Sequence, residues 1–269
     1  MSESEPLRVA IIGCGAAARE LHLPVLTGHP QATVTAVVDV DRERAQALAD
    51  AYHVPKVLTR VEDVDRAVAD AAVICTPPYH HAVGAQALLS RGLHVLVEKP
   101  LATTSRDARA MVDAAASARL VLAVGVFRRL FPSTRLVRRL LRSGWLGRVL
   151  EFDAEEGEVY AWPTATLGNM RRDLAGGGVL IDFGSHTMDR LLYMFPDEVR
   201  VLKYRDNARG GVESDCVVNL EMGCEGNRVQ GRIELGWFVD DKCLALDLVQ
   251  RGGGGLLGGR LARTAGQSG

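Results

Sequence analysis

The sequence has almost no net charge and no long apolar run. It carries 32 Lys and Arg against 33 Asp and Glu, a formal net charge of -1, so it lacks the positive field that attracts nucleic acid or anionic lipid. No apolar run reaches the roughly 20 residues that cross a bilayer. The chain starts with a polar, acidic stretch that does not resemble a signal peptide. We therefore expect a cytoplasmic protein with no nucleic-acid or membrane partner.

Paired cysteines are also missing. The five cysteines are an odd number and form no C-x-x-C pair, which argues against a disulfide framework or a structural zinc site and favours free thiols. His80 and His81 resemble a metal pair, but adjacent side chains point apart and no third ligand cluster lies nearby. The sequence predicts no metal site.

The first half of the chain alternates between strand-like and helix-like segments. Short apolar runs rich in branched residues predict buried strands, and runs of helix formers separate them. The predicted strands are 7–13, 33–40, 71–75, 94–97 and 120–126, and the predicted helices are 16–26, 42–52, 80–91 and 105–118. Such alternation with short connections produces right-handed crossovers around a parallel sheet. Residues 1–125 are predicted to form a doubly wound α/β domain.

The second half has consecutive strand-like segments with few helices between them. The predicted helices are 133–142 and 178–195, and the predicted strands are 148–158, 199–205, 212–222, 228–238 and 243–249. This order predicts an α+β domain over residues 126–250 with an open-faced, mainly antiparallel sheet. The glycine-dense stretch 251–269 loses much backbone entropy on ordering, so we expect it to be disordered.

A glycine-rich turn joins the first predicted strand to the first predicted helix. The residues Gly13-Cys14-Gly15-Ala16-Ala17-Ala18 fit the pattern G-x-G-x-x-A. Gly13 permits a tight turn, Gly15 lets the backbone approach a pyrophosphate, and Ala18 allows the helix to pack closely on the strand. The helix N-terminus then offers N–H groups to the phosphates. Residues 13 to 17 are therefore candidate cofactor contacts.

Asp39 ends the second predicted strand, at the position where dinucleotide-binding turns place an acidic residue. A carboxylate there accepts the ribose hydroxyls and repels a 2′-phosphate, so the sequence favours NAD over NADP. Arg42 and Arg44 follow closely, and either could pair with a 2′-phosphate. NADP therefore stays open as the less favoured cofactor.

Further motifs lie in the first predicted helix, after the third and fourth predicted strands, and in the second half of the chain. They are Leu21-His22-Leu23-Pro24, Thr76-Pro77-Pro78-Tyr79-His80-His81, Glu98-Lys99-Pro100, Gly176-Gly177-Gly178 and Asp182-Phe183-Gly184-Ser185-His186. With the glycine-rich turn, this ordered set resembles the Gfo/Idh/MocA oxidoreductases, the family of glucose-fructose oxidoreductase and inositol dehydrogenase. The resemblance runs from Val9 to the region of Trp237.

The resemblance implies a Rossmann domain followed by an open-faced sheet, and an NAD(P)-dependent enzyme. Lys99 matches the family's lysine beside the reacting carbon, and Asp182 and His186 match its D-x-x-x-H pair. Thr76, Pro77 and Glu98 match positions that border the nicotinamide and its ribose, and His81 is expected to line the same cofactor site. The implied reaction moves a hydride between nicotinamide and a secondary alcohol or ketone of a sugar, cyclitol or nucleotide-linked sugar. By analogy, a homo-oligomer would form through the C-terminal sheet.

The three candidate catalytic residues suit this chemistry. Their spacing puts Asp182 and His186 one turn apart on one helix face. We assign His186 as the general acid/base, because an imidazole exchanges protons near neutral pH. Lys99 would stabilise the developing alkoxide, and Asp182 would orient its partner. Lys99 acting as the acid/base itself remains an alternative.

The roles of the candidate substrate residues stay open, and the chain departs from the family pattern at some positions. Arg171 and Arg172 could bind an anionic group or be solvated, and Tyr160 and Trp162 could stack on a sugar or serve packing. The chain has Pro78 and Phe127 where the family often has Asn, and a glycine-dense tail where the family has further strands. Two alternatives therefore stay open: a cofactor-binding protein with little turnover, and a reductase of another carbonyl or imine.

Overall fold

The computed structural model describes residues 5–163, 167–224, 226–237, 243–252 and 255–263. The chain divides into two compact units, each described below by itself. The first comprises Met1–Gly125 with Trp162–Gly176, and the second Val126–Ala161 with Gly177–Gly269. A short segment from the middle of the chain thus belongs with its first half, which a single boundary near Gly125 does not anticipate.

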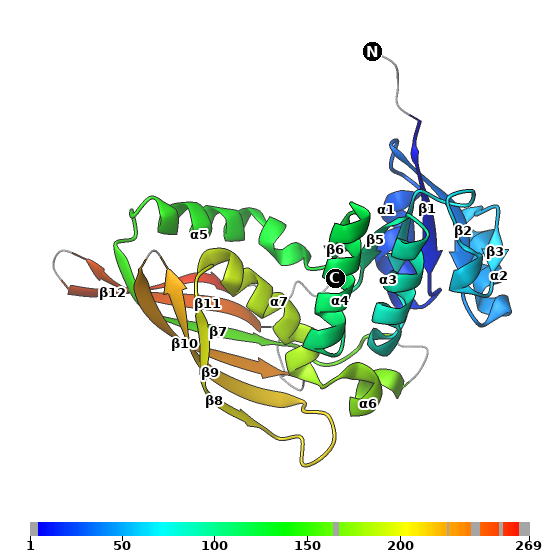
Figure 1. Ribbon diagram of the computed structural model, residues 1–269. Coiled ribbons are helices and arrows are strands. Elements are labelled where there is room, and N and C mark those ends of the chain that lie inside the picture. The colour runs from blue at the N-terminus through cyan, green and yellow to red at the C-terminus, as the bar shows by residue number, and fades with distance from the viewer. Residues whose placement is uncertain (1–4, 164–166, 225, 238–242, 253–254, 264–269) are drawn as a thin grey trace. The chain divides into compact units, whose positions relative to one another are not determined.

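The first unit is built on a six-stranded, all-parallel sheet in the order β3-β2-β1-β4-β5-β6 (Figure 1). Its strands are β1 (Leu7–Ile12), β2 (Ala32–Val38), β3 (Val57–Leu58), β4 (Ala71–Ile74), β5 (His94–Val97) and β6 (Leu122–Val124). Its helices are α1 (Leu23–Leu26), α2 (Arg42–Tyr52), α3 (His81–Ser90), α4 (Ser105–Ala118) and α6 (Arg172–Ala175), with single turns η1 (Ala18–His22), η2 (Val61–Asp63), η3 (Pro78–His80) and η5 (Leu167–Met170). The strand order reverses at β1 and β4, which confirms the predicted doubly wound sheet.

Strand β1 is buried on both faces of this sheet. Val9 and Ile11 enter one hydrophobic cluster, and Ala10 and Ile12 enter the other. Because successive side chains of a strand point to opposite faces, each cluster is the core beneath one layer of helices. The apolar run that predicted a buried strand therefore reflects burial on two sides.

Local capping sets the helix ends that the sequence predicted well. The Asp41 side chain accepts a hydrogen bond from the backbone N of Arg44 at 3.1 Å, and the Thr104 side chain accepts one from Asp107 N at 3.1 Å. The first predicted helix differs from expectation. Its residues Ala18–His22 form a π-helical turn before α1 begins. Such turns occur often at functional sites.

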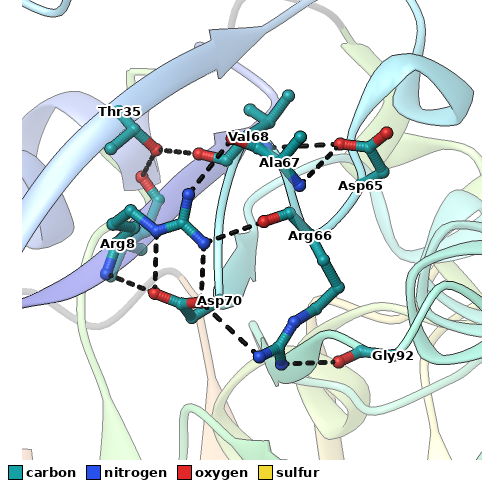
Figure 2. Close-up of polar contacts among 9 residues, drawn as sticks. Arg8, Thr35, Asp65, Arg66, Ala67, Val68, Asp70 and Gly92 are labelled. Carbon is teal, nitrogen blue, oxygen red and sulfur yellow. Dashed lines mark hydrogen bonds and ion pairs between the residues drawn. The ribbon is translucent and has the colours of Figure 1, made fainter.

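An arginine–carboxylate pair ties β1 to the segment before β4 (Figure 2). The Arg8 guanidinium donates to both carboxylate oxygens of Asp70, at 3.0 and 2.8 Å, and to the carbonyl oxygens of Arg66 and Ala67. Arg66 adds a second positive charge 3.8 Å from Asp70. These contacts hold the pKa of Asp70 at about 2, mainly through the hydrogen bond from Arg8.

The second unit is a helix-covered mixed sheet in the order β12-β11-β7-β10-β9-β8 (Figure 1). Its strands are β7 (Arg148–Gly157), β8 (Val199–Asp206), β9 (Asp215–Cys224), β10 (Asn227–Gly236), β11 (Cys243–Gly252) and β12 (Gly255–Arg263). Its helices are η4 (Phe127–Leu130), α5 (Pro132–Arg142) and α7 (Val179–Met194). All neighbouring strands are antiparallel except β7 and β10. This confirms the predicted α+β class.

Helix α7 packs its apolar face on the sheet of the second unit. Val179, Leu191 and Phe195 join a cluster with Phe152 of β7 and with Trp237, directly after β10. Phe152 and Phe195 stack with ring centroids 5.4 Å apart. The core therefore fixes the position of α7, which carries two of the predicted site residues.

The structure corrects the expected disorder beyond residue 250. Strand β11 continues to Gly252, and Gly255–Arg263 form β12, which pairs with β11 in antiparallel register. A hydrogen-bonded ladder of this length satisfies the backbone groups and offsets the entropy that glycines lose. The predictions for 253–254 and 264–269 lie outside the described residues. Among the described helices, none is long and apolar enough to cross a membrane.

Candidate active site

The glycine-rich turn follows β1 and has two glycines with different constraints. Gly13 has a φ of +91°, and a Cβ there would lie 2.8 Å from the backbone N of Thr76. Gly15 has no atom within 4 Å of its ideal Cβ position. Gly13 is therefore required by the fold of the turn, whereas Gly15 keeps an open space in front of the backbone. Ala16 is buried and Ala17 is half-buried at the helix start.

Asp39 lies under this turn and binds its backbone. Its carboxylate accepts from Cys14 N at 2.8 Å and from Asp41 N at 2.9 Å, and its side chain is 7% exposed. Arg44 reaches both carboxylate oxygens, at 3.3 and 3.4 Å, and also binds Asp41 at 3.0 Å. Arg42 is exposed and starts α2. Asp39 thus connects the end of β2 to the turn after β1.

The Cys14 thiol takes no part in this arrangement. Burial, together with the charge of Asp39, raises the pKa of Cys14 to about 12, so the thiol stays protonated at neutral pH. Cys14 donates its backbone N–H to Asp39, and its thiol donates to the carbonyl oxygen of Val38 at 3.8 Å. Cys75, Cys216 and Cys224 are also free thiols.

Glu98 follows β5 and connects three parts of the first unit. Its Oε1 lies 2.7 Å from Nε2 of His22, and its Oε2 accepts from Lys99 N at 3.2 Å. A Cβ on Gly125 would lie 3.0 Å from Oε1. The side chains of His22 and Glu98 are only 16% and 15% exposed. The half-buried Lys99 therefore extends from a loop that is anchored to the π-helical turn after the glycine-rich motif.

His81 lies beneath the loops that follow β4 and β5, and it is fully buried. Its Nδ1 lies 2.8 Å from the carbonyl oxygen of Pro100, and its Nε2 lies 2.8 Å from that of Thr76. Burial lowers the pKa of His81, and the two carbonyl contacts oppose that shift. The sequence predicted that the His81 ring lines the cofactor site, whereas the structure buries the ring beneath the two loops. Thr76 is half-buried, and its Oγ1 has no hydrogen-bond partner among the described residues, while Pro77 is exposed.

Asp182 and His186 occupy successive turns of α7 in the second unit, as predicted. Asp182 accepts a hydrogen bond from the indole Nε1 of Trp237 at 3.3 Å. His186 is 6% exposed, and the Phe127 ring meets it edge-on with centroids 5.3 Å apart. The phenyl ring at the position where the family often has Asn thus packs against the candidate acid/base.

Charged side chains surround this part of α7. Arg128 pairs with the buried Glu156, whose other oxygen accepts from Thr187. Burial and the nearby charge of Arg190 lower the pKa of Arg128 to about 10. Arg190 is itself 6% exposed, and its Nε and Nη2 have no hydrogen-bond partner in the described part of the chain.

Glu213 caps the start of α7. Its carboxylate Oε1 accepts from Gly178 N at 2.8 Å and from Leu180 N at 3.1 Å, and its carbonyl oxygen accepts from Val179 N at 2.8 Å. A Cβ on Gly178 would lie 1.9 Å from that carbonyl oxygen. The triple glycine therefore permits a close approach of backbone to backbone, and the carboxylate complements the positive end of the helix.

The predicted substrate residues belong to both units. Arg171 is exposed and pairs with Asp173 at 2.6 Å, and Arg172 is also exposed. Trp162, 42% exposed, belongs to the first unit, as both arginines do. Tyr160 belongs to the second, where it packs on Trp237 with ring centroids 4.9 Å apart.

Sequence reasoning missed three residues that organise these sites: His22, Glu213 and Trp237. His22 lay within the motif Leu21-His22-Leu23-Pro24, which gave a usable signal. Glu213 and Trp237 contact α7 from 35 and 55 residues away in the chain, and no local pattern indicates either contact. Within the described ranges, no group of three or more His, Cys, Asp or Glu side chains could hold a metal ion.

The fold and these residues define a dinucleotide-binding α/β unit followed by an α+β unit whose sheet carries one helix layer. Two family models match the chain. Residues 7–126 match the GFO_IDH_MocA model, described as an oxidoreductase family with an NAD-binding Rossmann fold, and residues 134–249 match the GFO/IDH/MocA C-terminal domain. The chain belongs to the Gfo/Idh/MocA family.

Named relatives are sugar enzymes. The chain is 32% identical to D-glucoside 3-dehydrogenase of Escherichia coli (strain K12), over 79% of this chain and 61% of the relative. It is 32% identical to dTDP-3,4-didehydro-2,6-dideoxy-alpha-D-glucose 3-reductase of Streptomyces antibioticus, over 72% of this chain and 58% of the relative. The chain thus spans less than two thirds of the length of these relatives.

Solved structures share the fold. GenD2 from gentamicin A biosynthesis, in complex with NAD, is 26% identical with a TM-score of 0.82, over 97% of this chain and 74% of that one. KijD10, a 3-ketoreductase from Actinomadura kijaniata in complex with NADP, is 21% identical with a TM-score of 0.78, over 96% and 85%. The neighbours therefore include binders of both nicotinamide cofactors.

Proposed function

We propose that this protein is an NAD(P)-dependent oxidoreductase that transfers a hydride between nicotinamide and a secondary alcohol or ketone of a sugar or nucleotide-linked sugar. The observation that carries the proposal is the turn after β1, where Gly15 leaves open space and the Asp39 carboxylate accepts a hydrogen bond from the backbone N of Cys14. The Thr76 hydroxyl after β4, which has no hydrogen-bond partner in the described part of the chain, also fits a cofactor on this sheet edge. The named sugar dehydrogenases and reductases favour turnover over the binding-only alternative.

In this proposal the first unit binds the cofactor and supplies a cation. The backbone of Gly13 to Ala17 and the N-terminus of the following helix bind the pyrophosphate. Bound nicotinamide supplies the hydride acceptor or donor. Lys99, held through Glu98 and His22, stabilises negative charge on the substrate oxygen.

The second unit supplies the proton transfer. His186 is the general acid/base, because a neutral imidazole accepts the hydroxyl proton as the carbonyl forms and returns it in the reverse reaction. Asp182 binds the substrate or the imidazole. Its carboxylate accepts a hydrogen bond from Trp237, and Glu213 caps the start of the helix that carries it. Arg171, Arg172, Tyr160 and Trp162 remain candidates for contacts with the rest of the substrate.

Mutation of the two reacting groups tests this assignment. The purified protein is mixed with NAD or NADP and a panel of glucosides, inositols and nucleotide sugars, and the absorbance of reduced nicotinamide is followed. We expect Lys99→Met and His186→Ala to slow single-turnover hydride transfer by about 10²- to 10⁴-fold. Lys56→Met and His29→Ala are matched controls at exposed positions and should keep the wild-type rate. Wild-type rates in both catalytic variants across pH would end the proposal.

We further propose that NAD is preferred over NADP. Asp39 accepts hydrogen bonds from Cys14 N, from Asp41 N and, at 3.3 and 3.4 Å, from Arg44, so a ribose hydroxyl would compete with the two long Arg44 contacts. Arg44 is already paired with two carboxylates, which reduces its attraction for a 2′-phosphate. The Kd values of NADH and NADPH should therefore differ in favour of NADH, and Asp39→Asn should narrow the difference. Tighter binding of NADPH by the wild-type protein would reverse this conclusion.

We also propose that the protein forms a homo-oligomer through the sheet of the second unit. Helix α7 packs on one face of this sheet, and nearly every residue of strand β8 is exposed, including Val201 and Leu202. Strand β8 lies at the edge of the sheet, where an exposed strand can pair with a second copy of the chain. Sedimentation velocity should give a mass above that of one chain, and Val201→Lys should reduce it. A monomer at micromolar concentration would contradict this.

A further inference from the structure

His81 connects the two loops at which the first unit would present its cofactor and its lysine. Strands β4 and β5 pair in parallel register, with Ile74 opposite Val97, so the loops after them start side by side. Thr76 lies in one loop and Pro100 in the other. The imidazole of His81 contacts the carbonyl oxygen of each at 2.8 Å.

The chemistry of these contacts gives each ring nitrogen a defined task. A backbone carbonyl oxygen accepts hydrogen bonds and never donates, so a nitrogen contributes to either bond only as N–H. The side chain is fully buried, so no water replaces a lost bond. Burial lowers the pKa of His81, and a neutral imidazole carries one N–H, so the ring donates to one carbonyl oxygen at a time. Donation from Nδ1 bonds the loop that carries Lys99, and donation from Nε2 bonds the loop that carries Thr76.

We propose that His81 is a positioning residue, whose Nδ1 bond to Pro100 fixes the loop that aims the Lys99 side chain. The inference rests on the proposed function of Lys99, since the bond matters for catalysis only if that ammonium meets the substrate. Full burial keeps His81 itself from touching cofactor or substrate. A phenyl ring would fill the same space, so packing alone does not account for an imidazole with both nitrogens on carbonyl oxygens.

Three substitutions separate the two bonds. His81→Asn places an amide N–H near the position of Nδ1 and can keep the Pro100 bond. His81→Gln reaches the position of Nε2 and can keep the Thr76 bond. His81→Phe keeps neither. His80→Asn is the matched control, since His80 is exposed and one residue earlier. If His81→Phe does not fold, the comparison of Asn with Gln still decides.

The readout is the reactivity of Lys99 in the protein without cofactor. Acetic anhydride acetylates lysines in their neutral form, and peptide mass spectrometry follows Lys99 against the exposed Lys56 as internal reference. We expect His81→Asn to keep the wild-type pH profile of Lys99 acetylation, and His81→Gln and His81→Phe to shift it. Thermal unfolding should place the Asn and Gln variants at similar stability, since each can keep one of the two carbonyl contacts. Identical Lys99 profiles in the Asn and Gln variants would overturn the proposal.

Turnover and cofactor protection separate this inference from the proposed function. On a substrate from the panel, His81→Gln should lower kcat by about tenfold to a hundredfold, as misplacement of a reacting group does, while the Kd of NADH stays near wild type. Adding NADH to the wild-type protein should slow Lys99 acetylation. Absence of that protection refutes the proposed function, whereas protection combined with equal kcat in the Asn and Gln variants refutes the role of His81 alone.

Discussion

The two glycines of the turn after β1 should serve different purposes, Gly13 the stability of the fold and Gly15 the binding of the cofactor, and substitution of each tests this. Both positions belong to the same motif, and both would be changed to alanine. Gly13 has a positive φ and backbone atoms within 3.0 Å of its ideal Cβ. Gly15 is not among the residues with positive φ, and its Cβ would meet nothing within 4 Å. The two substitutions should therefore act on different free energies.

The magnitudes follow from these environments. Gly13→Ala forces a left-handed conformation on alanine, at about 1–3 kcal/mol, and also displaces the backbone near Thr76. Gly15→Ala should leave the free energy of unfolding unchanged or raise it by about 0.4–1 kcal/mol, because alanine restricts the unfolded chain. Its methyl group would stand where the pyrophosphate approaches. The loss of one hydrogen bond to a charged group, about 1.5–3 kcal/mol, corresponds to a Kd for NADH that is roughly 10- to 150-fold higher.

Chemical denaturation and calorimetric titration with NADH measure the two quantities on the same samples. We expect Gly13→Ala to lower the unfolding midpoint and Gly15→Ala to keep it while weakening NADH binding. Two results would refute the reasoning. One is a Gly15→Ala protein that binds NADH as tightly as wild type, and the other is a Gly13→Ala protein of unchanged stability.

Three further predictions concern charged groups. Arg190→Met should raise the free energy of unfolding by about 1–3 kcal/mol, because it removes a buried guanidinium with two nitrogens that lack hydrogen-bond partners among the described residues. Arg129→Met should lower the free energy of unfolding, because it leaves Asp189 without its ion pair. Urea unfolding measures both, and an Arg190→Met protein less stable than wild type contradicts the first. The pKa of Asp70 is lowered to about 2 in the folded protein, so the ionised carboxylate stabilises the fold fully above its unfolded pKa of about 3.9, and this stabilisation is lost as the pH falls towards 2. The unfolding temperature of Asp70→Asn should therefore depend less on pH in this range than that of the wild-type protein, and an equal dependence counts against the prediction. Glu213→Gln keeps an acceptor for Gly178 N but removes the charge at the start of α7. It should therefore lower the unfolding temperature less than Glu213→Ala does, and equal effects would disprove a role for the hydrogen bonds.

Local signals made much of the fold predictable. Helices α2 and α4 and strand β5 have the predicted bounds. Asp41 and Thr104 cap the starts of the two helices through hydrogen bonds that span three residues. The apolar run 7–13 predicted β1, and glycine spacing predicted the turn that follows it. These features depend on side chains that lie next to one another in the chain.

The glycine-dense end shows the opposite case. Composition predicted disorder there, yet β12 pairs with β11. The predicted helix 16–26 contains a π-helical turn at Ala18–His22. In both places the outcome depends on partners outside the segment. A strand ladder needs a neighbour, and His22 at the end of the π-helical turn has its partner Glu98 76 residues away.

The sequence by itself determined the alternation of strands and helices, the phosphate-binding turn and the residue types suited to hydride transfer. Only the tertiary structure decided what holds those residues in place: Glu98 between His22 and Lys99, His81 between two loops, and Trp237 and Glu213 against α7. The physical reason is separation along the chain. Periodicity and capping act over a few residues, whereas a hydrogen bond between distant residues exists only once the folded backbone has brought its two atoms together.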